Sequence, residues 1–211
     1  MPERNRVTPY GEIIVAATER GRFMGNRGSL HEGHEIVRAW NGKRWITCVL
    51  EYRGWKAPTW EDEGRYTALF FHDEAVAFAA GHRPCALCRR ADYEGYRDAW
   101  EAALGERLGA DDMDTRLHRD RLDGRRKRLH PMQWHDLPDG AFVDLDGTPA
   151  LVTGSHVRPW APGDGYGPPI VRPASGVATV ITPAANVAVL LAGYPQTEKE
   201  GAGTRSALRH L

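Results

Sequence analysis

Residues 66–90, YTALFFHDEAVAFAAGHRPCALCRR, carry the clearest signals for the fold of this chain. The aromatic run over 66–71 is typical of a β-strand. Asp73 then stands where a helix N-cap is expected, and Gly81 would end a short helix over 74–80. Two cysteines with the spacing Cys-x-x-Cys follow directly after a proline. The stretch therefore predicts a strand, a short helix and a cysteine knuckle in immediate succession.

Cys85 and Cys88 form a candidate metal-binding pair. Two thiolates with this spacing on a tight turn can each approach one Zn²⁺ to about 2.3 Å. A redox-active pair is one alternative, although no thioredoxin-like βαβ pattern surrounds the motif. Two unrelated cysteines near a helix start are another. Cys48 is the predicted third ligand, but a small buried thiol with no metal would explain it as well.

Residues 68–89 resemble the metal-binding domain of the Ada DNA-repair proteins. That family has an aromatic strand, a short Ala-rich helix ending in Ala-Gly, and an Arg-Pro-Cys-x-x-Cys knuckle in this order. Its zinc site uses two further cysteines, four residues apart, upstream of the knuckle. Here the residue four positions after Cys48 is Tyr52, and the Pro-Cys-His-Arg motif of the family's methyltransferase half is absent. The resemblance implies a zinc site and an Ada-like fold for this segment, but not the repair reaction.

A tetrahedral zinc site needs a fourth ligand, for which we select His31 in the Gly-rich loop before the strand of Cys48. The alternatives are His34, His72 and His82, and each histidine could equally be an ordinary surface or core residue. A closed four-ligand site is usually structural, whereas an open position holds an activated water. Both remain open, and the structural role is favoured because paired thiolates donate charge to the metal and weaken its Lewis acidity.

The whole chain is predicted to have an α+β fold. Asn41-Gly42 predicts a hairpin between strands over 36–40 and 43–52, and apolar spacings of three and four predict an amphipathic helix over 91–108. Further expectations are a strand over 12–18, short β-like runs separated by Gly/Pro loops after residue 137, and a helix over 184–192. We expect an N-terminal Ada-like zinc-binding module with mixed strands and an amphipathic helix (1–110), a basic connecting segment (111–136), a continuous β-rich C-terminal segment (137–195) and a flexible tail (196–211).

The formal net charge is zero, with 28 Lys+Arg and 28 Asp+Glu, so the chain as a whole is not a polycation for nucleic acid. The charges are nevertheless uneven, since acidic residues 111–114 precede basic residues 116–128. Such clusters can neutralise phosphates, although charge runs are commonly just solvated faces. The predicted contacts to nucleic acid, with DNA favoured, are Arg27, Arg83, Arg89, Arg90, Arg125, Arg126, Lys127 and Arg128.

Three cysteines do not make a disulfide framework, and no apolar run is long enough for a membrane span. With no signal-peptide pattern at the N-terminus, a cytoplasmic location is expected. The predicted function is a cytoplasmic zinc-binding protein that contacts nucleic-acid phosphates, linked to DNA repair or regulation. One alternative is a zinc-dependent hydrolase or transferase with an open metal position, or with acid–base chemistry around His130 and His135. Another is a peptide or small-molecule binding module with structural zinc. No catalytic residue is assigned.

Overall fold

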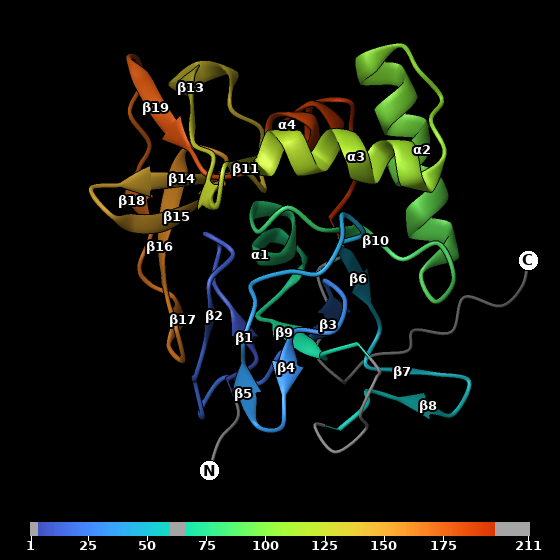
Figure 1. The fold of residues 1–211 in the computed structure, drawn as a ribbon. Helices are drawn as coiled ribbons and strands as arrows, with labels where there is room; N and C mark the ends of the chain where they lie inside the picture. Colours follow the sequence, from blue (N-terminus) through green and yellow to red (C-terminus); the bar gives the residue numbers. More distant parts are fainter. Residues whose placement is uncertain (1–3, 60–65, 197–211) are drawn as a thin grey trace, which may run out of the picture.

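The computed structural model describes residues 4–59 and 66–196, and over these residues it has four α-helices and two main β-sheets (Figure 1). The α+β class predicted from the sequence is confirmed. Within the described ranges, none of the helices is long and apolar enough to cross a membrane.

The first sheet gathers strands from the N-terminal half of the chain. Its six strands lie in the order β10-β6-β3-β9-β1-β2. Two of the pairings are parallel, β1 with β9 and β6 with β10, and the others are antiparallel. The strands are β1 (Arg6–Val7), β2 (Ile13–Ile14), β3 (Phe23–Asn26), β6 (Ile46–Cys48), β9 (Leu69–Phe71) and β10 (Arg83–Pro84).

The second sheet is antiparallel and comes from residues 130–180. Its order is β13-β19-β14-β15-β16-β17, with β18 also paired to β16. The strands are β13 (His130–Gln133), β14 (Phe142–Leu145), β15 (Thr148–Thr153), β16 (His156–Ala161), β17 (Gly165–Tyr166), β18 (Ile170–Val171) and β19 (Val177–Val180), and a 3₁₀ turn, Trp134–Asp136, follows β13. Three two-stranded ribbons complete the strands: β4 (His31–Glu32) with β5 (Glu35–Ile36), β7 (Glu51–Tyr52) with β8 (Trp55–Lys56), and β11 (Leu122–Asp123) with β12 (Arg126–Lys127).

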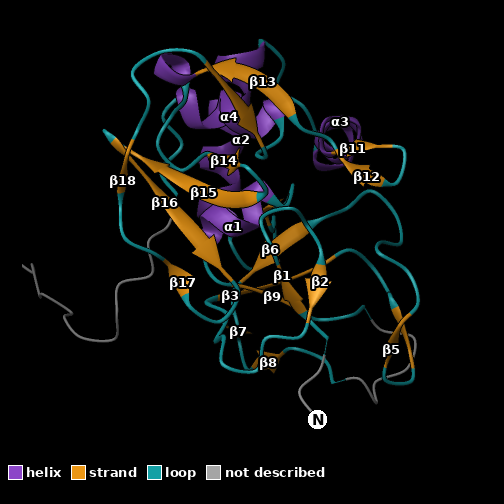
Figure 2. Cartoon of the chain, turned by 90° about the vertical axis from the view of Figure 1, so that its left-hand side faces the viewer, coloured by secondary structure: helices purple, strands orange, loops and turns teal. Residues whose placement is uncertain are grey.

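The helices join the two sheets into one packed body. Helix α1 (Glu74–Ala79) lies between the sheets and contacts β9 of the first and β14 of the second (Figures 1 and 2). The Asp73 side chain accepts a hydrogen bond from the Val76 amide, so the predicted N-cap is confirmed. Helices α2 (Arg90–Leu104) and α3 (Ala110–Arg121) both pack on α4 (Ala184–Leu191).

The largest of three buried hydrophobic clusters in the described residues spans the predicted segments. Phe78, Tyr96 and Trp100 from the predicted N-terminal module share one buried cluster with Val143 and Val180 from the predicted C-terminal segment. The division at residues 110, 136 and 195 stays a prediction, and the expected tail beyond residue 196 lies outside the described residues.

The hairpin predicted around Asn41-Gly42 is wrong. The Asn41 amide donates to the Arg27 carbonyl (2.7 Å), and Gly28 with its positive φ of 94° approaches the Asn41 carbonyl closely. The segment is therefore held against the loop after β3 rather than paired with itself. The predicted strand over 12–18 shrinks to Ile13–Ile14, and the helix predicted over 91–108 stops at Gly105, which adopts a left-handed conformation that glycine tolerates.

Candidate metal centre

Parallel pairing of β6 with β10 places Cys48 beside Cys85. Arg83 is in register with Ile46, and Pro84 with Thr47. Because parallel strands run in the same direction, the residue after each registered pair falls at the same end, so Cys48 and Cys85 become neighbours. The Cys85 amide donates to the Thr47 carbonyl (2.9 Å), which fixes this alignment.

A tight turn after β10 returns Cys88 to the same point. The Arg89 amide donates to the Cys85 carbonyl (3.1 Å), closing the turn. The Leu87 amide donates to Cys85 Sγ (3.4 Å), a contact that favours a thiolate at this position.

The three sulfur atoms lie within 4.8 Å of one another, and they are the one group of potential metal ligands of this kind among the described residues. Tetrahedral zinc with bonds of about 2.3 Å requires its sulfur ligands to be about 3.8 Å apart. Cys48, Cys85 and Cys88, called the cysteine site below, could therefore hold a metal ion with little rearrangement.

The surroundings of the cysteine site are apolar and closely packed. Cys48 and Cys85 are buried with Met24 and Ala68, and Cys88 is half-buried beside them. Hydrogen bonds with the other two thiols raise the pKa of Cys48, and burial raises it further. Hydrogen bonds from Cys48 and Cys88, together with backbone amides, lower the pKa of Cys85 to about 2. The site thus stabilises a thiolate at Cys85, the protonation state that a metal requires.

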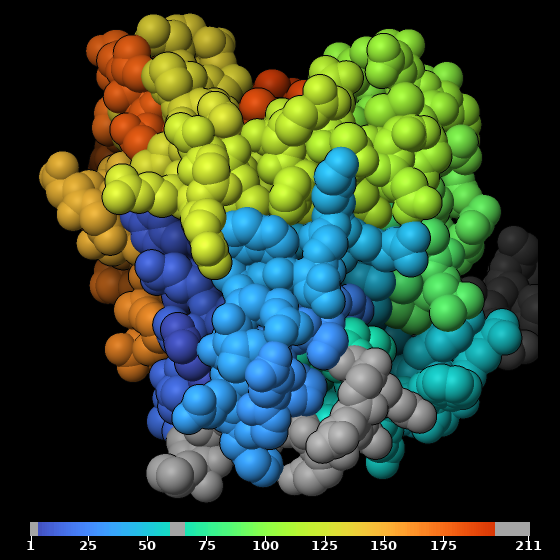
Figure 3. All heavy atoms as spheres, viewed as in Figure 1, coloured from blue at the N-terminus to red at the C-terminus, as the bar shows by residue number. Residues whose placement is uncertain are grey.

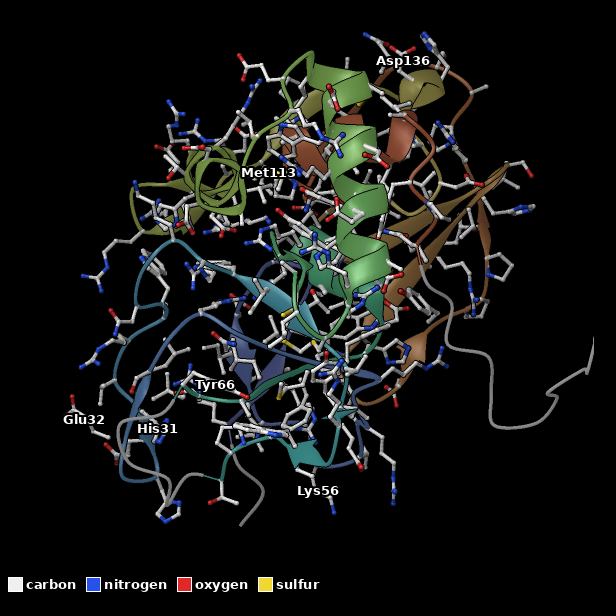
Figure 4. The ribbon with its side chains drawn as sticks, turned by 90° about the vertical axis from the view of Figure 1, so that its right-hand side faces the viewer. His31, Glu32, Lys56, Tyr66, Met113 and Asp136 are labelled. Carbon is white, nitrogen blue, oxygen red and sulfur yellow. The ribbon has the colours of Figure 1, made fainter. Side chains whose placement is uncertain are left out.

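His31 is not part of this group, and its prediction as the fourth ligand is not supported by the geometry. It lies in β4, on a ribbon away from the cysteine site (Figure 4). Its Nδ1 lies 2.6 Å from Thr67 Oγ1, an arrangement that holds the loop to the segment before β9.

The alternative histidines also have other contacts. His82 is fully buried, and its Nε2 accepts a hydrogen bond from Arg27 Nε (3.2 Å). His72 Nδ1 lies 3.6 Å from Glu19 Oε1. In the described part of the chain no histidine, aspartate or glutamate joins the three cysteines, so no fourth protein ligand is identified.

Two arginines predicted to contact phosphates, Arg83 and Arg89, are buried in ion pairs. Arg83 donates two hydrogen bonds to Asp114 (2.9 and 2.7 Å), which ties the cysteine knuckle to α3. Arg89 lies 2.7 Å from Glu74 Oε1 and donates to Asp92 Oδ2 (2.7 Å), which ties it to α1 and α2. Both guanidinium groups are buried in these pairs, so the geometry does not support either as a phosphate contact, and the two contacts stay predictions.

The other predicted basic contacts divide into two groups. Arg27 is buried, and the Lys127 ammonium donates inward to the Ala79 carbonyl, so neither is a surface contact. Arg90, Arg125, Arg126 and Arg128 are exposed.

The pair His130 and His135, considered for acid–base chemistry, does not form a joint site. His130 Nε2 lies 2.9 Å from the Thr182 carbonyl oxygen and belongs to β13. His135 is exposed on the following 3₁₀ turn, 3.3 Å from Asp136.

Sequence reasoning missed Asp114, Arg121 and Trp45. Asp114 and Arg121 belong to the charged helix that was interpreted as a connecting segment, yet both are buried. Trp45 is buried against the guanidinium groups of Arg27 and Arg121, whose Cζ atoms lie 4.0 and 3.9 Å from its ring centroid. The helical spacing of Met113, Leu117 and Arg121 was the available signal, since it places Arg121 on the buried face of α3.

Comparison of the chain with profiles of known protein families, with curated proteins and with solved structures finds no match to any of them.

Proposed function

We propose that this protein binds one Zn²⁺ through Cys48, Cys85 and Cys88, and that the metal has a structural role. The mutual approach of the three sulfurs supports the proposal most directly. Cys48 ends β6, Cys85 directly follows β10 and Cys88 lies in the turn before α2, so a metal here would link β6, β10 and the start of α2. Three thiolates donate strongly to zinc and weaken its Lewis acidity, which argues against metal-assisted hydrolysis as the main role.

The fold of this region is proposed to be an Ada-like metal-binding module. The order of strand β9, helix α1 and knuckle is the order expected from the resemblance, and β6 supplies Cys48 from the same sheet. In this proposal Cys48 is the upstream ligand, and Tyr52 lies where the family has its other upstream cysteine.

Metal analysis of the purified protein tests the zinc proposal. We expect about one zinc per chain, lost in Cys85→Ser together with much of the stability, because structural metal binding contributes directly to folding. Met24→Leu is the matched control, since Met24 pairs with Cys48 across β3 and β6 and is buried in the same cluster. Unchanged zinc content and stability in Cys85→Ser would contradict the proposal.

X-ray absorption at the zinc edge would identify the coordination. Three sulfurs and one light atom are expected. The His31→Gln variant then tests the fourth ligand. Loss of an imidazole signal in that variant would identify His31 as a zinc ligand.

A second proposal, supported by the exposed arginines, is contact with nucleic-acid phosphates in the cytoplasm, in a repair or regulatory role. Arg125, Arg126 and Arg128 lie together on and beside the β11–β12 ribbon. Fluorescence anisotropy with duplex and single-stranded DNA should show affinity that falls with salt, and Ala at these three positions should lower the salt slope by about 0.9 per lost phosphate contact. An unchanged slope would remove this proposal and leave the zinc proposal intact.

A further inference from the structure

A second feature of the molecule is a cavity of ≈ 400 Å³ that shares no lining residue with the cysteine site. It lies where three distant segments meet, residues 10–12, 39–45 and 121–127. In Figure 3 these are the dark blue, light blue and yellow segments, which lie against one another on the face shown. We call it the cation cavity, because Arg27, Arg121, Arg125, Arg126 and Lys127 all line it.

Three of these cationic side chains are directed into the protein. Arg27 and Arg121 are buried, at 1% and 0% exposed. Lys127 is half-buried along its length and its Nζ donates to the Ala79 carbonyl. Gly81, with no side chain, leaves room for the Arg121 side chain, which would lie 2.6 Å from a Cβ at that position.

The partners of these groups are neutral. Arg27 Nη1 donates to the Gly11 carbonyl (2.7 Å), and Arg121 donates to the Gly81 and Lys43 carbonyls (2.9 and 2.6 Å). Among residues 4–59 and 66–196 no ion pair with a carboxylate is formed by Arg27, Arg121 or Lys127. The acidic residue of the cavity lining is Glu12, which is exposed.

Some hydrogen-bonding capacity is also unused. Arg27 Nη2 and Arg121 Nε are buried and have no hydrogen-bond partner among the described residues. A buried donor without a partner costs free energy, and a buried charge without a counter-charge costs more. Burial lowers the pKa of Arg27 to about 9, which reflects the same cost.

We infer that the cation cavity binds a phosphate monoester dianion. A dianion would supply the missing counter-charge to Arg27, Arg121 and Lys127, and its oxygens would accept from the unused donors. Guanidinium groups match the geometry of phosphate oxygens, and exposed Arg125 and Arg126 would attract the anion to the cavity. The volume exceeds that of phosphate alone, so the ester group would lie along Trp40 and Tyr10 at the cavity wall.

The phosphate could belong to a small free ester or to the 5′ end of a nucleic acid. This site shares no residue with the cysteine site. It shares Arg125 and Arg126 with the surface proposed to contact nucleic acid, but its ligand, a monoester dianion, differs from a backbone phosphodiester.

Isothermal titration with inorganic phosphate at constant ionic strength tests the inference. Saturable binding is expected for the full chain. Arg27→Met and Lys127→Met should each weaken it by on the order of 10- to 100-fold, because each removes a charge-assisted hydrogen bond. Exposed Arg126→Ala should weaken it about two- to fivefold, and it keeps the test valid should a buried variant fail to fold. Arg119→Ala, an exposed arginine of α3 outside the cavity, is the matched control and should bind as the unaltered protein does.

Two dinucleotides then distinguish the source. If a 5′-phosphorylated dinucleotide binds at least about tenfold more tightly than inorganic phosphate and its 5′-hydroxyl counterpart does not bind, the site takes a nucleic-acid end. If the phosphorylated dinucleotide gains nothing over inorganic phosphate, the site takes a small free ester. Equal binding of both dinucleotides, no saturable phosphate binding by the unaltered protein, or unchanged binding in Arg27→Met, Lys127→Met and Arg126→Ala would overturn the inference.

Discussion

Arg83 and Arg89 are buried beside carboxylates, whereas Arg27 and Arg121 are buried beside carbonyl oxygens and the ring of Trp45. The first pair lies around the cysteine knuckle and the second lines the cation cavity. Both pairs are removed from water, so they carry similar desolvation costs, but the protein supplies a counter-charge to the first pair alone. The difference suggests that the knuckle arginines hold the structure together and that the cavity arginines are arranged for a ligand.

The cysteine site and the cation cavity also differ in how well each tolerates the absence of a ligand. Cys48 and Cys88 keep their protons, and their hydrogen bonds stabilise the thiolate at Cys85, so the site is tolerable without a metal. Guanidinium groups give up protons far less readily than thiols do. The cation cavity therefore has the stronger need for a counter-ion from outside the chain.

The largest effect is expected from breaking a knuckle pair. Arg83→Met would leave the Asp114 carboxylate buried without its partner, and we expect it to lower the free energy of unfolding by about 3–5 kcal/mol. Urea denaturation measures the change. The double variant Arg83→Met/Asp114→Leu should recover most of the loss, because no charge then remains unpaired. If Arg83→Met lowers the free energy of unfolding by less than about 1 kcal/mol, the buried pair contributes no more than an exposed salt bridge does.

Acid should destabilise the cavity region through His82. Burial, and then the charges of Arg27 and Arg121, lower the pKa of His82 well below 6.5. The unfolded chain takes up a proton near pH 6.5 and the folded protein does not, so the free energy of unfolding should fall as the pH drops below about 6.5, by at most about 1.4 kcal/mol per pH unit for this group.

NMR titration of the His82 ring would separate it from His118, whose pKa is also lowered by burial and by Arg121. The His82 signal should remain that of a neutral ring well below pH 6.5, and Arg27→Met should move its titration toward 6.5. A normal titration in the unaltered protein would contradict the effect of burial and of the cavity charges on this ring.

The matched substitution in the cavity should have a smaller effect on stability. Arg27→Met removes a buried cation that has no carboxylate partner, so the loss of its hydrogen bond to the Gly11 carbonyl is offset by relief of the desolvation cost. We expect the free energy of unfolding in phosphate-free buffer to change by less than about 1 kcal/mol. Urea denaturation of both variants tests the comparison, because Arg83→Met should lower the free energy of unfolding by several kcal/mol more than Arg27→Met does. Equal losses in the two variants would mean that both arginines are structural.

Local features of the sequence predicted the local structure well. The Asp73 cap, the knuckle spacing and the periodicity before Gly105 each depend on neighbours within a few residues, and helices α1 and α2 follow them closely. The approach of Cys48 to Cys85 was predicted because a zinc site prefers thiolate ligands and Cys48 is the one cysteine of the chain outside the knuckle.

The rest depended on long-range packing, which no short pattern contains. Asn41-Gly42 has a hairpin signal, but the flanking strands pair elsewhere, β5 with β4 and β6 with β3 and β10, and the Asn41 amide donates to the Arg27 carbonyl. Basic residues look alike in sequence, whether they pair with Asp114, close on Trp45 or remain exposed. The position of each in a helix face or strand register decides which it does, and that position is fixed by tertiary contacts.

Arg90 is an exposed arginine in an ion pair, and its replacement should change the free energy of unfolding least. It lies 2.5 Å from Glu94 one turn along α2, with 68% of its side chain exposed. Exposed pairs at this spacing contribute about 0.3–0.5 kcal/mol and are screened by salt, so Arg90→Ala should lower the free energy of unfolding by less than about 0.5 kcal/mol. Adding salt should remove even this difference between the two proteins. A larger, salt-independent loss would show that Arg90 supports the neighbouring knuckle through packing of its stem over Tyr93, where its Cζ lies 5.8 Å from the ring centroid, rather than through charge.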